Sequence, residues 1–268
     1  MNCILCNAKT TEKNFSKINV NKCQSCSFEF FDSSAFRDSD YFKNYYSSLR
    51  VPDKEKLKLR EKQYKIDSKI IQDHMSPSKS LLDIGCSNGG FIYQLNKLGY
   101  TNLTGIDIDV SAIDYANEHY SDCNNFYTTL LHQFDSEKKY DCFIFRGTLQ
   151  YLGFDLHAAF EKILTLANPN AKIIILSLPN SDSPQYQLFE DEWHLFNYEG
   201  HSLIFNLLSL KTLGNIYKMN MLNYEYPYIE TIYQNVKKDV QSFKENILSN
   251  SFTPHAFWGN MIECVFQL

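Results

Sequence analysis

The sequence has no apolar run approaching the roughly 18 residues that a membrane-spanning helix needs, so it indicates no membrane span. Its first residues, Met1–Cys6, lack the basic and apolar segments of a signal peptide, and we therefore expect a cytoplasmic protein. A basic excess is also missing, because the net charge is −5, and this argues against a large nucleic-acid footprint. What the 268 residues do contain is 44% hydrophobic side chains, enough for a sizeable core, and eight cysteines.

Four of the cysteines form two Cys-x-x-Cys pairs near the start of the chain. Cys3 and Cys6 precede Cys23 and Cys26 at a spacing typical of a four-cysteine zinc site. Such a site closes a tetrahedron of thiolates with no open position for water, so we expect the zinc to be structural. Two redox pairs, or reduced cysteines without metal, are the alternatives. The other cysteines are expected to be packing residues: Cys86, Cys123, Cys142 and Cys264.

The basic residues concentrate before residue 80. Leu59, Ile66 and Ile70 recur among them at near-helical spacing, which predicts an amphipathic connecting helix. A solvated helix face is the simpler interpretation of its charge, and an anion site is the alternative. The residues concerned are Lys54, Lys56, Lys58, Arg60, Lys62, Lys65 and Lys69.

From residue 80 onward apolar strands alternate with amphipathic helices. The expected strands are Ser80–Gly85, Asn102–Asp107, Asp141–Phe145 and Lys172–Leu178. A helix is expected over Ser111–Tyr120, and another carries an apolar stripe from Leu156 to Leu164. This alternation predicts an α/β fold with a doubly wound parallel sheet, whose ligands bind beyond the carboxyl ends of the strands.

Two turns after these strands carry the chemistry. The first is glycine-rich, with Gly85, Ser87 and Gly90 at the positions where a dinucleotide site has three glycines. The missing middle glycine argues against NAD, and Asp83, just before the turn, can organise the loop and meet a ligand ammonium. Asp107 ends the second strand and is expected to accept hydrogen bonds from both ribose hydroxyls. Asp109 is expected to cap the next helix.

These segments together resemble the class I S-adenosylmethionine-dependent methyltransferases. The resemblance lies in LLDIGCSNGGF, GIDID, YDCFIFRGTLQYL and NPNAKIIILSLPN, in order and at fitting spacing. It extends to a subgroup of bacterial surface-glycan and natural-product enzymes with an N-terminal zinc ribbon. These enzymes also share a tyrosine-rich stretch like residues 40–46, a segment like Trp193–His201 and a final strand like Phe257–Met261.

The resemblance implies a Rossmann-like methyltransferase sheet with a small zinc ribbon. We expect the ribbon over residues 1–36, the tyrosine-rich segment and basic helix over 37–79, and the methyltransferase domain over 80–268. An acceptor or lid insertion is expected at about 181–218. The four ribbon cysteines would hold Zn²⁺.

The resemblance also implies residue roles. The methionine-side pocket would be shaped by the turn residues Asp83, Gly85, Cys86 and Gly89. Asp107 would hold the ribose, Ile108 the adenine face, Thr129 and Leu130 the adenine edge, and Arg146 the channel to the acceptor. One departure from many relatives is Gln150-Tyr151, which stands where they have a Glu-His pair, so a catalytic role of that pair is not carried over.

Methyl transfer from a sulfonium needs positioning and, for a hydroxyl acceptor, a base near neutral pKa. His201 and His194, in the expected insertion, are the candidate bases, and a hydrogen-bonding role in the lid is the alternative. Trp193, Phe196 and Tyr198 are expected to form an apolar wall of the pocket. A cofactor lid is a further candidate role for three tyrosines, Tyr41, Tyr45 and Tyr46, and ordinary packing is the alternative.

The function expected on this basis is S-adenosylmethionine-dependent O-methylation of a small acceptor. A sugar or nucleotide-sugar-like precursor in bacterial surface-polysaccharide biosynthesis is the specific expectation. The alternatives are a zinc-ribbon ribosomal-RNA methyltransferase, C- or N-methylation of a natural product or sugar, a non-catalytic module of the same fold, and an NAD-dependent dehydrogenase. The acidic net charge and the lack of an Asn-Pro-Pro-Tyr-type motif argue against RNA.

Overall fold

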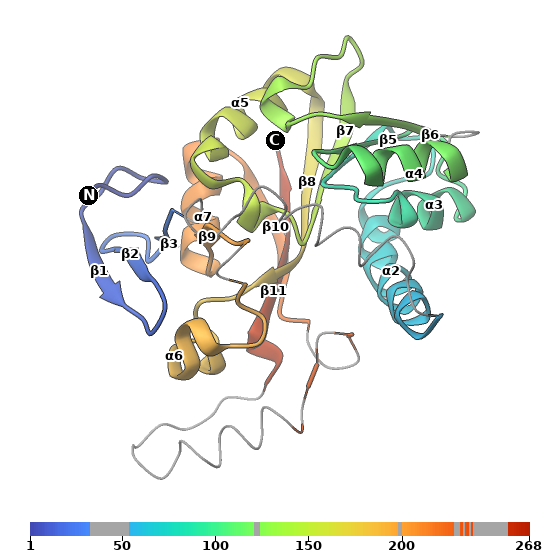
Figure 1. Cartoon of the computed structure of the whole chain (residues 1–268). Coiled ribbons are helices and arrows are strands. Elements are labelled where there is room, and N and C mark those ends of the chain that lie inside the picture. Colours follow the sequence, from blue (N-terminus) through green and yellow to red (C-terminus); the bar gives the residue numbers. More distant parts are fainter. Residues whose placement is uncertain are drawn as a thin grey trace.

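The computed structural model describes residues 1–32, 54–120, 124–197, 200–227, 231–232, 234–235, 237 and 257–268. Its central element is a seven-stranded sheet with the spatial order β10-β11-β8-β7-β4-β5-β6 (Figure 1). The strands are β4 Leu81–Ile84, β5 Leu103–Asp107, β6 Asn124–Thr128, β7 Tyr140–Arg146, β8 Ala167–Pro179, β10 Asn220–Glu225 and β11 Met261–Gln267. The chain order reverses between β4 and β7, which makes this the switch point of a doubly wound sheet.

The sheet is mixed rather than wholly parallel. Strands β4 to β8 pair in parallel, but β11 runs antiparallel to both of its neighbours, β8 and β10. The expected final strand over Phe257–Met261 is also wrong in its position, since Phe257–Asn260 is a 3₁₀ turn (η7) and the strand begins at Met261. A buried strand looks the same in sequence whichever way it runs, so the hydrophobic pattern carries no sign of direction.

Helices cover both faces of the sheet (Figure 1). One face carries α2 Lys54–His74, α3 Gly90–Lys97 and α4 Val110–Tyr120, and the other carries α5 Leu156–Leu166 and α7 Leu207–Ile216. Successive residues of β7 alternate between the two cores: Cys142 and Ile144 pack toward α3 and α4, whereas Phe143 and Phe145 pack toward α5 and α7. This period of two is what a strand buried on both faces requires.

The predicted basic helix is confirmed as α2, and Ile70 of its predicted apolar stripe packs against the core, but the stripe as a whole does not coincide with the buried face. Leu59 is 51% exposed, whereas Gln63, Asp67 and Ile71 are buried. Three of the buried residues of α2 are polar, namely Gln63, Asp67 and Ser68, and sequence periodicity counts only apolar residues. The buried Asp67 carboxylate needs a charged or hydrogen-bonding partner. That partner is Arg146, which is described below with the site.

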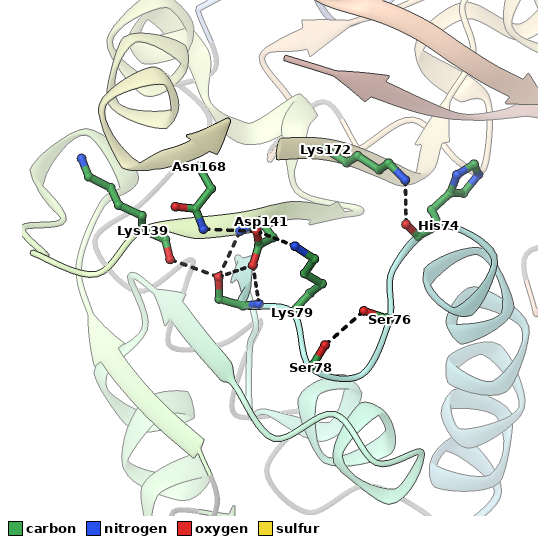
Figure 2. A network of polar contacts seen from close by, with 9 residues as sticks. His74, Ser76, Ser78, Lys79, Lys139, Asp141, Asn168 and Lys172 are labelled. Carbon is green, nitrogen blue, oxygen red and sulfur yellow. Dashed lines mark hydrogen bonds and ion pairs between the residues drawn. The ribbon is translucent and has the colours of Figure 1, made fainter. Parts of the chain in front are cut away.

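A polar network fixes the amino ends of the strands, opposite the switch-point edge (Figure 2). The Asp141 carboxylate accepts hydrogen bonds from the Ser80 N–H at 3.0 Å and the Ser80 hydroxyl at 2.9 Å. It also accepts one from the Asn168 amide at 3.2 Å and pairs with Lys79 at 3.3 Å. Nearby, the Lys172 ammonium donates to the His74 carbonyl at 2.7 Å, at the end of α2. These contacts join the starts of β4, β7 and β8 and thereby hold their far ends in register.

The N-terminal cysteines lie at one end of a second, four-stranded sheet of order β1-β2-β3-β9, with Cys23 as the last residue of β2 and the others in turns or loops outside the strands. Its strands are β1 Thr10–Asn14, β2 Asn19–Cys23, β3 Glu29–Phe30 and β9 Leu203–Ile204. Strand β9 lies far from the other three strands in the sequence. Phe28 and Phe30 pack with residues of the main core such as Phe205. The described part of the expected ribbon is therefore continuous with the main domain.

The expected acceptor insertion over 181–218 divides into two parts. Helix α7 packs Leu210 and Leu213 into the main core, so it is one of the regular sheet-covering helices. The preceding part contains α6 Pro184–Phe189, η5 Glu190–Glu192 and β9, and it packs against the ribbon. Residues 33–53, Cys123 and Tyr198 lie outside the described residues, and with them the lid candidates Tyr41, Tyr45 and Tyr46. Within the described chain, no helix has the length and apolarity to span a bilayer.

Candidate functional site

A cavity of about 450 Å³ opens at the carboxyl ends of β4, β5, β7 and β8. This is the switch-point edge at which doubly wound sheets bind ligands. Its volume lies in the range of roughly 300–1,000 Å³ typical of small-molecule sites. Each of the four strands contributes to its lining at or just after its carboxyl end, through Gly85 after β4, Asp107 of β5, Arg146 of β7 and Ser177 of β8.

The turn after β4 needs its glycines for geometric reasons. Gly85 has φ +77°, and a Cβ there would overlap the Thr148 side chain. Gly89 has φ +76°, and a Cβ there would lie 2.8 Å from the Phe126 ring. The glycines let the turn pack this closely against its neighbours. Because they carry no side chains, the backbone N–H groups of the turn and the start of α3 can also approach a ligand closely.

Asp107, at the end of β5, is oriented by two backbone groups. Its Oδ2 accepts a hydrogen bond from Ser87 N at 2.8 Å, and its Oδ1 accepts one from Asp109 N at 2.9 Å. Burial raises the pKa of Asp107, while these backbone hydrogen bonds act to lower it. A carboxylate offers about four lone-pair sites, so this group is chemically suited to accept hydrogen bonds from two adjacent ligand hydroxyls. Asp109 caps α4 through Ala112 N at 2.7 Å, which confirms that prediction.

The structure brings most of the expected cofactor residues to the cavity, but not all of them. Six of the nine line it: Gly85, Asp107, Ile108, Thr129, Leu130 and Arg146. Ile108 and Leu130 are 42% and 39% exposed, so two large apolar side chains flank the same cavity without being packed. Such a pair can sandwich a flat aromatic ring.

Asp83, Cys86 and Gly89 do not line the cavity. Cys86 is 5% exposed and packs among core residues beside Gly105, which confirms the expectation that its side chain is a packing residue. Its burial raises the pKa of the thiol well above the ordinary value. Gly89 contributes backbone conformation behind the turn. The sequence motif gave no information about which way each side chain of the turn points.

Asp83 lies behind the turn rather than on the cavity surface. It is 3% exposed, and its Oδ1 has no hydrogen-bond partner among the described residues. Burial raises the pKa of Asp83 to about 7, although the Arg146 charge acts to lower it. Direct contact with a ligand ammonium, as expected from the sequence, is therefore not available to it in this geometry.

Arg146, at the end of β7, is held by the buried face of α2. Its Nε donates to Asp67 Oδ2 at 2.7 Å, and Gln63 donates to Asp67 Oδ1 at 2.6 Å. The guanidinium lies 4.6 Å from the centre of the Tyr64 ring. Sequence analysis missed Gln63 and Asp67, and also Tyr64, which lines the cavity. Arg60 lines it as well and is one of the basic residues named there for a possible anion site. Polar pairs four residues apart on one helix were the available signal.

At the other end of the cavity lies His201, which is 5% exposed. Its Nδ1 accepts a hydrogen bond from Asn197 N at 3.3 Å, and the Tyr151 ring meets it edge-on at 5.0 Å. A backbone N–H can only donate, so this contact leaves the proton of the neutral ring on Nε2. In this arrangement His201 presents a hydrogen-bond donor, and a base role requires the Asn197 contact to be exchanged.

His194, the second candidate base, is exposed and does not line the cavity. The expected apolar wall is wrong for Trp193 and Phe196, because both are buried against Tyr186 of α6 and against the ribbon residues Phe15 and Phe31 instead. Its third member, Tyr198, lies outside the described residues. Apolar contacts to the cavity come from other residues, namely Leu152, Pro179, Leu195, Ile232 and Met261.

Two buried side-chain atoms of the cavity lining have no hydrogen-bond partner among the described residues. Gln150 donates from Nε2 to the Gly147 carbonyl at 3.0 Å, which leaves its buried Oε1 without a partner among the described residues. The Ser177 hydroxyl, also buried, is in the same condition. Both residues line the cavity. A buried polar atom without a hydrogen bond is costly, so both fit a polar ligand that completes them.

The four ribbon cysteines converge on one point. Their Sγ atoms all lie within 4.8 Å of one another, with Cys3–Cys26 at 3.9 Å and Cys6–Cys23 and Cys6–Cys26 at 3.5 Å. Zn–S bonds of about 2.3 Å in a tetrahedron place sulfurs roughly 3.8 Å apart, so the donor set fits zinc. The N–H groups of Ser25 and Cys26 point at the Cys23 sulfur at 3.4 Å, as a thiolate would require.

Comparisons with known proteins agree with this geometry. A family model described as a methyltransferase domain matches residues 59–218. The Burkholderia thailandensis 1,6-didemethyltoxoflavin-N1-methyltransferase is 14% identical, with a TM-score of 0.57 over 97% of this chain and 98% of that one. The plantazolicin methyltransferase BpumL, solved with S-adenosylhomocysteine, is 20% identical, with a TM-score of 0.55 over 88% and 93%. At these identities the two structures show the fold alone.

One curated relative matches locally. The human EEF1A lysine methyltransferase 2 is 50% identical over 44 residues, which are 16% of this chain. The match spans about a fifth of that relative's length (19%).

Proposed function

Because the chain belongs to the methyltransferase domain family and is an S-adenosylmethionine-dependent methyltransferase, we propose that its acceptor is an uncharged small molecule carrying hydroxyl groups. The observation that carries this proposal is the composition of a single cavity. One half has the oriented Asp107 carboxylate and the Gly85 turn, and the other half has neutral hydrogen-bonding groups.

The cofactor half offers a contact for each part of S-adenosylmethionine. Asp107 would accept the ribose hydroxyls, and Ile108 and Leu130 would enclose the adenine. Arg60 and Tyr64, from α2, reach the same cavity and offer a cation and a hydroxyl for the methionine carboxylate. Arg146 is already paired with Asp67, so we assign it to holding α2 against the site rather than to binding an anion.

The acceptor half favours hydroxyl-rich ligands. Gln150, Ser177 and His201 supply neutral polar groups there, and Leu152 and Leu195 supply apolar contacts. Among the described residues that line the cavity, the only lysine or arginine side chains are Arg60 and Arg146, on the cofactor side. A sugar matches this mixture of hydrogen bonds and apolar faces. A precursor of a bacterial surface polysaccharide is the specific acceptor that the sequence resemblance suggests.

Bound S-adenosylmethionine supplies a methyl group already activated on a sulfonium. The protein then has to hold the acceptor oxygen in line and accommodate its proton. Gln150 and Ser177 would orient the acceptor through their unpaired atoms. His201 would donate from Nε2 to the acceptor, or take its proton after the Asn197 contact is exchanged.

We also propose that the ribbon holds structural zinc. Four thiolates give a closed coordination sphere, so the metal would have no position for substrate or water. Its chemistry would be confined to stabilising residues 1–32, which have too few buried residues for a core of their own.

A labelling experiment tests the acceptor class. The purified full chain is incubated with S-adenosylmethionine labelled in its methyl group, together with separate small-molecule, RNA and protein fractions of a bacterial extract. We expect label in the small-molecule fraction. Hydrolysis of the labelled product should release a sugar that carries the label as an O-methyl group. Label in RNA would establish the ribosomal alternative, and label in protein lysines would establish protein methylation. An N-methyl or C-methyl small product would refute the oxygen acceptor alone.

A further inference from the structure

We infer that the cysteine ribbon is a fixed part of the acceptor wall, which positions His201 through the pairing of β3 with β9. The inference rests on the proposed function, since it concerns the acceptor half of that same site. It assigns positioning roles to Asp191 and Ser202, which have no role in binding the cofactor.

The first observation is the strand pairing. Glu29 and Phe30 of β3 pair antiparallel with Ile204 and Leu203 of β9, which begins two residues after His201 (Figure 1). Ser202, which lies between His201 and β9, is held by two backbone hydrogen bonds. Its carbonyl accepts a hydrogen bond from Phe31 N at 3.0 Å, and its N–H donates to the Gln150 carbonyl at 2.9 Å. The ribbon and the turn that carries Gln150 and Tyr151 therefore fix the backbone next to His201.

The second observation is the contact at the tip of the β1–β2 hairpin. Asp191, which is 4% exposed, accepts hydrogen bonds from the Ser16 hydroxyl at 2.7 Å and from Lys17 N at 2.6 Å. A buried carboxylate is stable only with such partners, so the hairpin tip and η5 must stay together. Two residues later begins the segment Trp193–Asn197, whose last residue contacts the His201 ring.

A third contact lies between these two. Glu29 is fully buried, accepts a hydrogen bond from the Tyr186 hydroxyl at 2.5 Å, and pairs with Lys22 at 3.0 Å. Tyr186 belongs to α6 and packs against Trp193 and Phe196. On the other side of the ribbon, His157 joins the Ile4 carbonyl of the first cysteine knuckle to Tyr217 at 2.7 and 2.6 Å.

These contacts differ from those of an independent recognition module. A ribbon that recruits a macromolecule needs a free face and a flexible connection, whereas this one shares a sheet, the hydrogen bonds of the buried Glu29 and Asp191 carboxylates, and an aromatic cluster with residues 184–206. Loosening the hairpin tip therefore loosens the acceptor wall first. The cofactor half, built on β4 and β5, shares no contact with Asp191.

The test uses the full chain and compares Asp191→Ala with Glu192→Ala. Glu192 is the adjacent residue, but it is mostly exposed, and its polar contacts among the described residues are to the exposed side chains of Lys17 and Ser16. Amide hydrogen exchange is measured at Phe31 and Ser202, together with the imidazole NMR signals of His201 and the dissociation constant for S-adenosylhomocysteine. We expect Asp191→Ala to speed exchange at both amides about tenfold and to shift the His201 signals. We also expect it to change cofactor affinity less than twofold.

Three outcomes would overturn the inference. Exchange rates in Asp191→Ala equal to those of Glu192→Ala would show that the hairpin tip is uncoupled from Ser202. Unchanged His201 signals would show that the coupling stops short of the cavity. Loss of cofactor affinity together with faster exchange throughout the sheet would show a general loss of stability instead.

A milder variant covers the case in which Asp191→Ala does not fold. Ser16→Ala removes one of the two hydrogen bonds and leaves the Lys17 N–H contact, so we expect the same changes at smaller size. A wild-type protein that fails to bind S-adenosylhomocysteine would refute the proposed function, but the exchange comparison needs no cofactor and still decides the positioning role.

Discussion

Asp107 combines two tasks in a single side chain. It holds the β4 turn through Ser87 N, and in the proposed function the same carboxylate also accepts the ribose hydroxyls. Asp109, two residues on, serves only the helix, as the cap of α4. The pair offers a matched comparison, because the two carboxylates are neighbours with different partners.

Asp107→Asn should weaken binding of S-adenosylhomocysteine by roughly 10- to 100-fold. The reason is that hydrogen bonds to a charged acceptor contribute about 1.5–3 kcal/mol and the amide cannot accept two hydroxyl hydrogen bonds in the same geometry. Asp109→Asn should bind like wild type, since asparagine is an equally good cap. Calorimetric titration of both variants checks this, and equal affinities would remove the ribose role from Asp107.

The buried acids predict how stability depends on pH. The pKa of Asp83 is raised by burial to about 7, above its ordinary value of 3.8. The folded protein therefore keeps a proton that the unfolded chain releases, and the contribution is lost as pH rises from about 4 through 7. Glu263, raised by burial to a pKa of about 8, acts in the same direction.

Asp83→Asn should therefore gain stability relative to wild type as pH rises. We expect the difference in unfolding free energy to shift by a few kcal/mol in the variant's favour between pH 4 and pH 8, at about 1.4 kcal/mol per unit of pKa. Urea unfolding at the two pH values measures it. A difference that stays constant with pH would mean that Asp83 is ionised in the folded protein.

At the scale of elements, the strands and helices that carry the site could be predicted from the sequence. The side-chain contacts that hold these elements against one another could not. The four core strands and α4 follow from apolar runs between turn residues, and Gly85 and Asp107 follow from their places after strands. The partners Asp67 and Gln63 of Arg146 lie on α2, far away in sequence. A polar residue on a helix looks exposed until its partner is known, so periodicity assigned that face to solvent.

Substitutions in the network of Figure 2 test whether the amino edge of the sheet can be destabilised without weakening cofactor binding at the opposite edge. Asp141→Ala removes hydrogen bonds to Ser80 and Asn168 and should cost about 1–3 kcal/mol of unfolding free energy. Asp114→Ala, on the exposed face of α4, should change stability by less than about 0.5 kcal/mol. Both should bind S-adenosylhomocysteine like wild type. A cofactor defect in Asp141→Ala at full stability would contradict this separation.

At the scale of the whole molecule, residues that are far apart in sequence build one acceptor wall. Strand β9 completes the ribbon sheet, and the ribbon in turn covers α6 and the Trp193–Asn197 segment (Figure 1). Cys-x-x-Cys spacing predicted the cluster of cysteines, but no local pattern could predict its strand partner. A two-residue strand such as Leu203–Ile204 is defined only by the chain that it pairs with.

Metal removal should act on the ribbon before the core. Treatment with a strong chelator should lower the unfolding temperature by several degrees, because zinc bound only by the folded ribbon stabilises it. Cys23→Ser should show the lower temperature already and respond no further to the chelator. If the chelator leaves wild type unchanged and metal analysis finds no zinc, the cysteines are reduced and metal-free.

The central claim is that the cavity at the switch point binds the methyl donor. Calorimetric titration of the wild-type chain with S-adenosylhomocysteine, with NAD as the comparison, tests it most directly. We expect one site per chain with a dissociation constant on the order of 1–100 µM, and no saturable heat from NAD. Saturable binding of NAD with none of S-adenosylhomocysteine would contradict the account.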